Sequence, residues 1–141
     1  MDLILWRHAE AEADSDDMRR RLTSKGRKQA ERVGEWLLQR LPARFLLLSS
    51  PAVRAHQTAQ ALGMPIKVDE TLAPGASVAT ILGVAQKHQG LVIIVGHQPD
   101  LGRAAAQLVA NMRAEWHFEK GAIWWFSRGR IKAVVSPELL N

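Results

Sequence analysis

Short apolar segments that alternate with helix-like stretches constrain the fold of this chain more than any other feature of its sequence. Each segment is short and almost uniformly apolar, which is typical of a strand covered on both faces. The segments lie at residues 3–6, 45–48, 91–95, 122–126 and 131–135, with a weaker one at 66–68. They predict a largely parallel sheet with a layer of helices on each side.

Four stretches between the strands are predicted to be helices. Their expected ranges are residues 24–41, a stretch from about residue 51, residues 77–88 and residues 99–111. Thr23 is a favoured N-cap for the first helix, and Pro42 is expected to end it. Ser50 is expected to cap the second helix, with Pro51 at its first position.

The order of these elements predicts an α/β fold in a single domain over residues 1–141. Arg128, Gly129 and Arg130 separate the last two strands and predict a hairpin with glycine in its turn. The expected architecture is a three-layer sandwich with a mostly parallel central sheet, an antiparallel edge hairpin and helices on both faces. The polar residues 9–22 are expected to form a mobile loop over one end of the sheet.

Cationic and imidazole side chains follow three of the predicted strands. Arg7 and His8 come directly after the first strand, and His97 follows the third after one glycine. Arg54 comes shortly after the second strand, in the first turn of the predicted helix. Because ligands of open parallel sheets bind beyond the carboxyl ends of the strands, these four residues are expected at one edge. Two helix N-termini add partial positive charge there.

This cluster suits a tetrahedral oxyanion such as a phosphoryl group. Arg7 and Arg54 can each bind phosphate oxygens through paired hydrogen bonds. Neighbouring positive charges disfavour the protonated form of His8, so its neutral ring can attack phosphorus. The formal net charge of +5 also favours an anionic substrate or partner.

The same residues resemble the histidine phosphatase superfamily. The resemblance is carried, in order along the chain, by LILWRHAEAE, RLTSKGRKQA, LLLSSPAVRAHQTA and VIIVGHQPDLG. The short chain and the RHA form of the RHG signature resemble the SixA-type phosphohistidine phosphatases. The resemblance implies that His8 is the nucleophile and carries a transient phosphohistidine. It further implies that Arg7 and Arg54 bind the phosphate, that His97 donates to it, and that no metal or organic cofactor is needed.

Two further substrate-binding residues, Arg20 and Glu70, are expected from the resemblance. Arg20 best fits the family's arginine before Leu-Thr, although Arg19 and Arg21 adjoin it. Larger members carry a general acid, either a glutamate after a middle strand or an aspartate after the second histidine. Glu70 lies in the region of the first, and Asp100 lies three residues after His97. Whether either carboxylate, or neither, acts as the acid is left open.

The predicted function is a metal-independent phosphatase that acts through a phosphohistidine intermediate and removes phosphate from phosphohistidine on proteins. Cleavage of phosphohistidine expels imidazole, whose conjugate acid has a pKa of about 6.5, so a missing acid favours this substrate. The alternatives are a small-molecule phosphomonoesterase of the same superfamily, a mutase, or a non-catalytic anion-binding or nucleic-acid-binding module.

The expected partner is therefore a phosphorylated protein or a small phosphate substrate. A nucleic-acid partner is disfavoured because the aromatic residues lie in apolar strands and are not interleaved with lysines. No apolar stretch reaches the roughly 20 residues of a membrane span, and no signal peptide is recognised. With no cysteine in the chain, these features predict a cytoplasmic protein without a membrane partner. A monomer is expected because nothing in the sequence demands a dimer.

Overall fold

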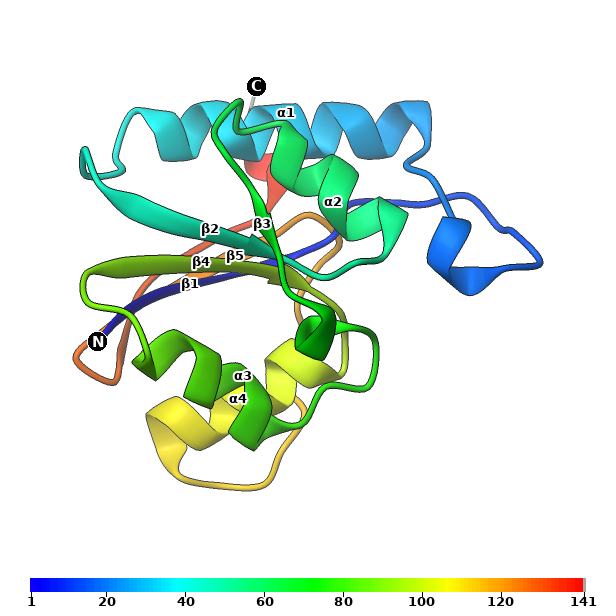
Figure 1. Ribbon diagram of the computed structural model, residues 1–141. Coiled ribbons are helices and arrows are strands. Elements are labelled where there is room, and N and C mark those ends of the chain that lie inside the picture. The colour runs from blue at the N-terminus through cyan, green and yellow to red at the C-terminus, as the bar shows by residue number, and fades with distance from the viewer. Residues whose placement is uncertain (141) are drawn as a thin grey trace.

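A six-stranded mixed sheet forms the centre of the molecule (Figure 1). The computed structural model describes residues 1–140. The strands are β1 (Asp2–Arg7), β2 (Phe45–Ser49), β3 (Lys67–Val68), β4 (Leu91–Gly96), β5 (Ile123–Ser127) and β6 (Arg130–Val135). Their order across the sheet is β3-β2-β4-β1-β5-β6. The pairs β3-β2, β2-β4 and β4-β1 are parallel, and β5 is antiparallel to both β1 and β6. The predicted parallel sheet with an antiparallel edge hairpin is therefore confirmed.

Four helices cover the two faces of this sheet. They are α1 (Ser24–Leu38), α2 (Val53–Gln60), α3 (Val78–Gln86) and α4 (Asp100–Ala110). Three short 3₁₀ helices complete the part of the chain that the structure describes: η1 (Asp17–Arg19), η2 (Glu70–Leu72) and η3 (Pro137–Leu139). Figure 1 shows α1 and α2 on one face and α3 and α4 on the other, as the three-layer prediction requires. Within residues 1–140, no helix is both long and apolar enough to cross a bilayer.

The central position of β1 in the sheet explains why its residues 3–6 are all apolar. Its side chains alternate between the faces of the sheet, and both faces are covered. Leu3 and Leu5 pack with α3 and α4, in the cluster that includes Leu101. Ile4 and Trp6 pack on the opposite face with α1 and α2. Because neither face meets water, the polar residues of β1 are confined to its ends.

Two predicted helix boundaries are wrong. The first helix ends at Leu38 and not at residue 41, since the N–H groups of Arg40 and Leu41 both bond to the Leu37 carbonyl in a closing turn. The second helix begins at Val53, and Ala52 is its N-cap without a side-chain hydrogen bond. Ser50 is not the N-cap, because the helix begins three residues after it; its hydroxyl accepts from Ala52 N–H at 3.2 Å and also contacts the ring of a histidine described below.

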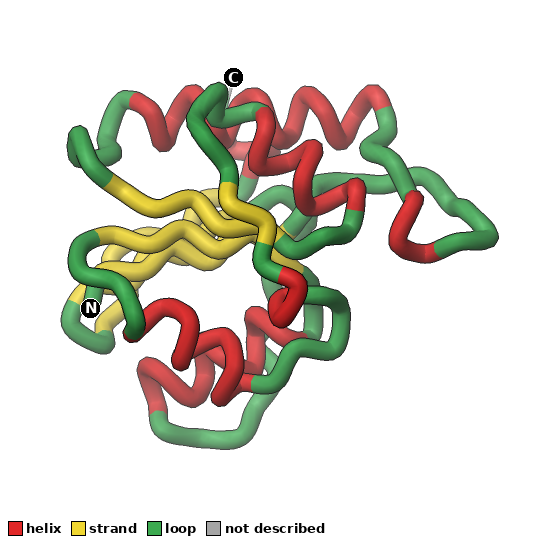
Figure 2. Tube along the Cα trace, viewed as in Figure 1, coloured by secondary structure: helices red, strands yellow, loops and turns green. Residues whose placement is uncertain are grey.

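The loop predicted over residues 9–22 is tied to the molecule at several points. Figure 2 shows that it contains the short helix η1. An isolated antiparallel bridge joins Ala11 to Leu22, and Glu12 N–H donates to the Arg21 carbonyl at 2.7 Å. The loop therefore returns on itself and places η1 beside the N-terminal turn of α2, where Asp17 contacts Arg54.

A close backbone contact at Gly102 gives a prediction about stability. A methyl group at Gly102 in α4 would overlap the carbonyl of Trp116. Gly102→Ala is expected to lower the free energy of unfolding by about 1–3 kcal/mol, because backbone atoms must shift. Gly83→Ala is the matched control: Gly83 lies in α3 with no atom within 4 Å of the added carbon. That change is expected to stabilise the protein by up to about 1 kcal/mol. Urea unfolding measures the free energy of unfolding of both variants, and an equal change in the two would contradict the prediction.

Candidate active site

The four residues predicted at the strand ends lie together at the carboxyl edge of the sheet. β1 and β4 are paired in register, with Arg7 opposite Gly96, so His8 and His97 emerge side by side. Their ring centroids are 5.3 Å apart. Arg54, in the first turn of α2, places its Nε 3.3 Å from Nε2 of His8. His8, Arg54 and His97 are all buried.

The His8 ring is held in one orientation. Its Nδ1 lies 2.8 Å from the Ala9 carbonyl, which can only accept, so Nδ1 carries the proton in the neutral ring. Nε2 then carries the ring's unprotonated lone pair, which accepts a hydrogen bond from Arg54 Nε. The His8 backbone is fixed as well, since its N–H donates to the Gly96 carbonyl and its carbonyl accepts from Gly121 N–H. The strand therefore presents Nε2 as a nucleophile.

Both site histidines are neutral at pH 7. Burial lowers the pKa of His8 to about 4, and the positive charges of Arg54 and Arg7 add to this effect while the bond to the Ala9 carbonyl opposes it. Burial also lowers the pKa of His97 to about 3, with further contributions from His8 and Arg54. A neutral imidazole is the form that can attack phosphorus.

Two buried nitrogens of this cluster lack a hydrogen-bond partner in the described part of the chain. They are Nε of Arg7 and Nδ1 of His97. The other ring nitrogen of His97 lies 2.7 Å from the Ser50 hydroxyl. Buried polar atoms are seldom unpaired, so the Arg7 Nε–H, and the His97 Nδ1–H in the tautomer that donates from this nitrogen, are available to an oxyanion. The Arg7 guanidinium, to which one of these two nitrogens belongs, also carries a permanent positive charge.

Each arginine of the cluster is anchored at the same end of its guanidinium. Arg7 donates from Nη1 to the Phe118 carbonyl at 2.7 Å, and Arg54 donates from Nη1 to the Asp17 carbonyl at 2.7 Å. The Phe118 ring stacks on Trp124, with centroids 4.7 Å apart and planes 5° apart. These anchors orient both arginines before any substrate arrives.

The loop contributes Arg20 and Asp17. Arg20 donates from Nε to the Glu12 carbonyl at 2.9 Å and pairs with the Asp17 carboxylate. Its charge contributes to the lowered pKa of both site histidines. Arg19 pairs instead with Asp16 in solvent, and Arg21 is exposed. Of the three neighbouring arginines, Arg20 is therefore the one that joins the site.

Sequence reasoning missed Asp17, Ser50 as a site residue, and the Phe118 carbonyl. Asp17 accepts from Arg54 Nη2 at 3.1 Å. The Arg54 and Arg20 interactions outweigh slight burial and hold the pKa of Asp17 below its usual value, so this carboxylate is ionised. The one signal in the sequence was the spacing of three between Asp17 and Arg20, which also occurs at many surface ion pairs.

Within residues 1–140, neither of the two carboxylates considered as general acids is hydrogen-bonded to His8. Glu70 begins η2 and is exposed; within residues 1–140 it has no hydrogen bond or ion pair with the four strand-end residues. Asp100 is buried at the N-terminus of α4, and its Oδ2 accepts from Gly75 N–H at 2.9 Å. Burial raises the pKa of Asp100, although bonds from Gly75 and Ala76 oppose the rise. Asp100 thus ties the loop before α3 to α4.

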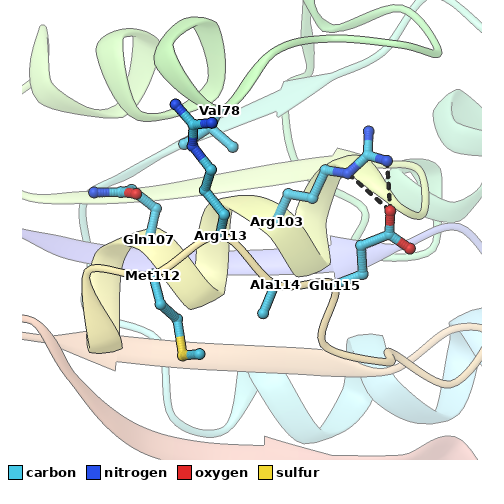
Figure 3. A pocket seen from close by; sticks show the side chains of 7 residues that line it. All are labelled: Val78, Arg103, Gln107, Met112, Arg113, Ala114 and Glu115. Atoms are coloured by element: carbon cyan, nitrogen blue, oxygen red, sulfur yellow. Dashed lines mark hydrogen bonds and ion pairs between the residues drawn. The ribbon is translucent and has the colours of Figure 1, made fainter.

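A separate hollow of about 390 Å³ lies between α4 and the segment that follows it (Figure 3). Arg103 donates to the Glu115 carboxylate at its rim, and none of the four strand-end residues lines it. The described residues contain no group of three or more histidine, aspartate or glutamate side chains arranged as metal ligands.

Comparison with known proteins agrees with this arrangement of strand-end residues. A model of the histidine phosphatase superfamily (branch 1) matches residues 3–74, which include Arg7, His8 and Arg54. This chain belongs to the histidine phosphatase superfamily. The resemblance seen in the sequence is therefore confirmed, and the protein is a phosphatase by family.

Two curated proteins and one solved structure match three quarters of this chain or more. The phosphohistidine phosphatase SixA homolog of Haemophilus influenzae is 32% identical, over 77% of this chain and 77% of its own length. An uncharacterised protein of Picosynechococcus is 36% identical, over 99% of this chain and 93% of its own. The solved structure of the protein histidine phosphatase SixA complexed with tungstate is 25% identical, covers 100% of both chains, and has a TM-score of 0.85.

The lowered histidine pKa values predict the pH dependence of this histidine phosphatase. An ordinary histidine nucleophile would be protonated below about pH 6.5, but His8 stays neutral to its pKa of about 4. In kcat/KM, which reports the free enzyme, the acidic limb due to His8 is therefore expected near pH 4 and not near pH 6.5. The unfolded state binds protons more readily, so His8 and His97 stabilise the fold above pH 6.5 and lose this contribution as the pH falls below it. NMR titration of the His8 ring in the free enzyme is the direct check, and a pKa near 6.5 there would contradict the assignment.

Proposed function

We propose that this phosphatase removes the phosphoryl group from phosphohistidine side chains of other proteins. The observation that carries the proposal is the position of the Asp17 carboxylate, which is bonded to the Arg54 guanidinium beside His8; this contact lowers its pKa and keeps it ionised. An ionised carboxylate cannot donate a proton to a leaving group. Asp100 is engaged with Gly75, and Glu70 is exposed. A leaving group that departs without strong acid assistance suits this site best.

The names of two relatives support the same substrate class. One is a phosphohistidine phosphatase SixA homolog, and the other is a protein histidine phosphatase whose structure holds tungstate. Tungstate is a tetrahedral oxyanion like phosphate, and this chain gathers Arg7, Arg54 and His97 around the nucleophile. The electrostatics of the site thus fit a dianionic phosphoryl group.

The first step is a transfer of the phosphoryl group to His8. Arg7, Arg54 and His97 bind the phosphoryl oxygens and stabilise the charge that develops on them. The Nε2 lone pair of His8 attacks phosphorus in line, forming a new P–N bond as the P–N bond of the substrate breaks. The substrate imidazole leaves with the electron pair and takes a proton from solvent.

The second step returns the enzyme to its starting state. Water attacks the phosphorus of phosphorylated His8, so that a P–O bond forms and the P–N bond to Nε2 breaks. His8 regains its lone pair, and inorganic phosphate leaves with the same arginines still facing it. Because Nδ1 of His8 remains bonded to the Ala9 carbonyl throughout, the ring returns to the same orientation.

The proposal is tested with two peptides of one sequence, one carrying phosphohistidine and the other phosphoserine. General acid catalysis is worth about 10²–10⁴-fold, so kcat/KM for phosphohistidine is expected to exceed that for phosphoserine by at least about 10²-fold. Equal or faster cleavage of the ester would overturn the proposal and move the substrate to small phosphomonoesters. Free phosphoramidate is the control for access, because it carries the P–N bond without a peptide.

A further inference from the structure

We propose that Asp17 is a positioning residue. It holds Nη1 and Nη2 at the end of the Arg54 guanidinium, so that the side edge formed by Nε and Nη2 faces the phosphoryl group at His8. The inference rests on the reaction proposed above and adds a residue to it. Asp17 lies on η1, in the loop between β1 and α1. It has no predicted role in the chemistry, and its carboxylate does not contact His8.

Asp17 binds Arg54 twice, through its backbone and through its side chain. Its carbonyl accepts from Arg54 Nη1 at 2.7 Å, and its Oδ2 accepts from Nη2 at 3.1 Å. Its other carboxylate oxygen lies 3.4 Å from Nη1 of Arg20. The two oxygens that grip Arg54 therefore occupy the end edge of the guanidinium, formed by Nη1 and Nη2.

The side edge of the guanidinium points the other way. A guanidinium is planar, and the N–H of Nε lies parallel to one N–H of Nη2 on the same side. In Arg54 the Nε–H is directed at Nε2 of His8. A phosphoryl group bonded to Nε2 would meet this side edge, which can form two parallel hydrogen bonds with phosphate oxygens. The Asp17 contacts and the phosphate contacts therefore use different N–H groups.

The loop is built to deliver these contacts. The Arg54 side chain is 5% exposed, while that of Asp17 is 59% exposed. A guanidinium this deeply buried needs a partner for its charge, and Asp17 supplies one from the loop. The side chain of Asp16 caps η1 by accepting from Met18 N–H at 3.1 Å. Arg20 anchors the other end of η1 through the Glu12 carbonyl.

In the opposite role, the Asp17 carboxylate would compete with phosphate for Arg54 and would occupy the guanidinium until phosphate displaced it. The two roles predict opposite changes in phosphate affinity. Removal of a competitor strengthens phosphate binding, and so does the mere loss of a nearby negative charge. Removal of a positioning group weakens phosphate binding because Arg54 is no longer held with its side edge toward His8.

The test is calorimetric titration of the full chain with inorganic phosphate. Asp17→Ala is expected to weaken phosphate binding by about tenfold, the usual scale of one lost hydrogen bond to a charged group. Glu12→Ala is the matched control, since the exposed Glu12 carboxylate lies on the same loop, has no hydrogen bond or ion pair within residues 1–140, and its loss changes the charge equally. It is expected to change the affinity less than twofold. Asp17→Asn keeps a side-chain oxygen and is expected to restore part of the loss.

A double-mutant cycle separates action through Arg54 from independent contact with phosphate. In an Arg54→Lys background, Asp17→Ala is expected to change the phosphate affinity less than twofold. Tighter binding in Asp17→Ala, an unchanged affinity, or an undiminished loss in the Arg54→Lys background would overturn the proposal, as would a parent protein that binds no phosphate. Because this readout needs no turnover, a parent that binds phosphate but leaves phosphohistidine intact would refute the proposed function alone.

Discussion

His8→Ala is expected to lower kcat by at least about 10⁴-fold, because removal of a nucleophile eliminates the covalent route. The parent enzyme, mixed with a phosphohistidine protein and quenched within a turnover, is expected to carry phosphate that is stable to alkali and labile to acid. The variant is expected to carry none. The neutral ring with its free Nε2 makes His8 the residue that bears this label.

His88→Ala is the matched control for the His8 experiment. His88 follows α3, in the turn that leads into β4, at the edge of the sheet opposite the site. Its replacement is expected to leave both label and turnover within about twofold of the parent, the usual range for a change far from the chemistry. Label that persists in His8→Ala would assign the nucleophile elsewhere.

Arg54→Lys is expected to lower kcat/KM by about 10²–10³-fold, the scale for removal of one preorganised donor to a developing oxyanion. Lysine keeps the positive charge, but its single ammonium cannot face His8 and bind both Asp17 oxygens as a planar guanidinium does. Retention of charge should leave the fold intact. Steady-state kinetics with the phosphohistidine peptide measure the effect, and urea unfolding checks the fold.

The control for this change is Arg103→Lys. Arg103 lies in α4 and pairs with Glu115 in the hollow away from the site, with half of its side chain exposed. Kinetic constants within about twofold of the parent are expected there, since exposed pairs contribute about 0–1 kcal/mol. An Arg54→Lys enzyme as active as the Arg103→Lys enzyme would show that charge alone suffices at position 54.

The residues that the sequence predicted best are those attached directly to apolar strands. Arg7, His8 and His97 each follow a buried strand, and parallel strands bring their carboxyl ends to one edge. Arg54 could be predicted nearly as well, because a helix N-terminus follows its strand after a short turn. Their convergence depends on topology rules and on few details of packing.

The partners of these residues could not be predicted in the same way. The Phe118 carbonyl that anchors Arg7 is 111 positions away in the chain, and its place depends on stacking against Trp124. Any residue has a backbone carbonyl, so the sequence carries no mark of this one. Ser50 was assigned to a helix cap by local preference, whereas its position beside His97 depends on the pairing of β2 with β4.

The place of β1 in the sheet has a consequence for synthesis on the ribosome. β1 is made first, yet both of its neighbours, β4 and β5, come from residues 91–127. Translation of the intervening chain therefore proceeds while the apolar strand β1 has no partner for its backbone. During that interval the segment Leu3–Trp6 is an exposed template for pairing with other chains. Nascent chains stalled before β4 are thus expected to be the species that chaperones bind and that aggregate first.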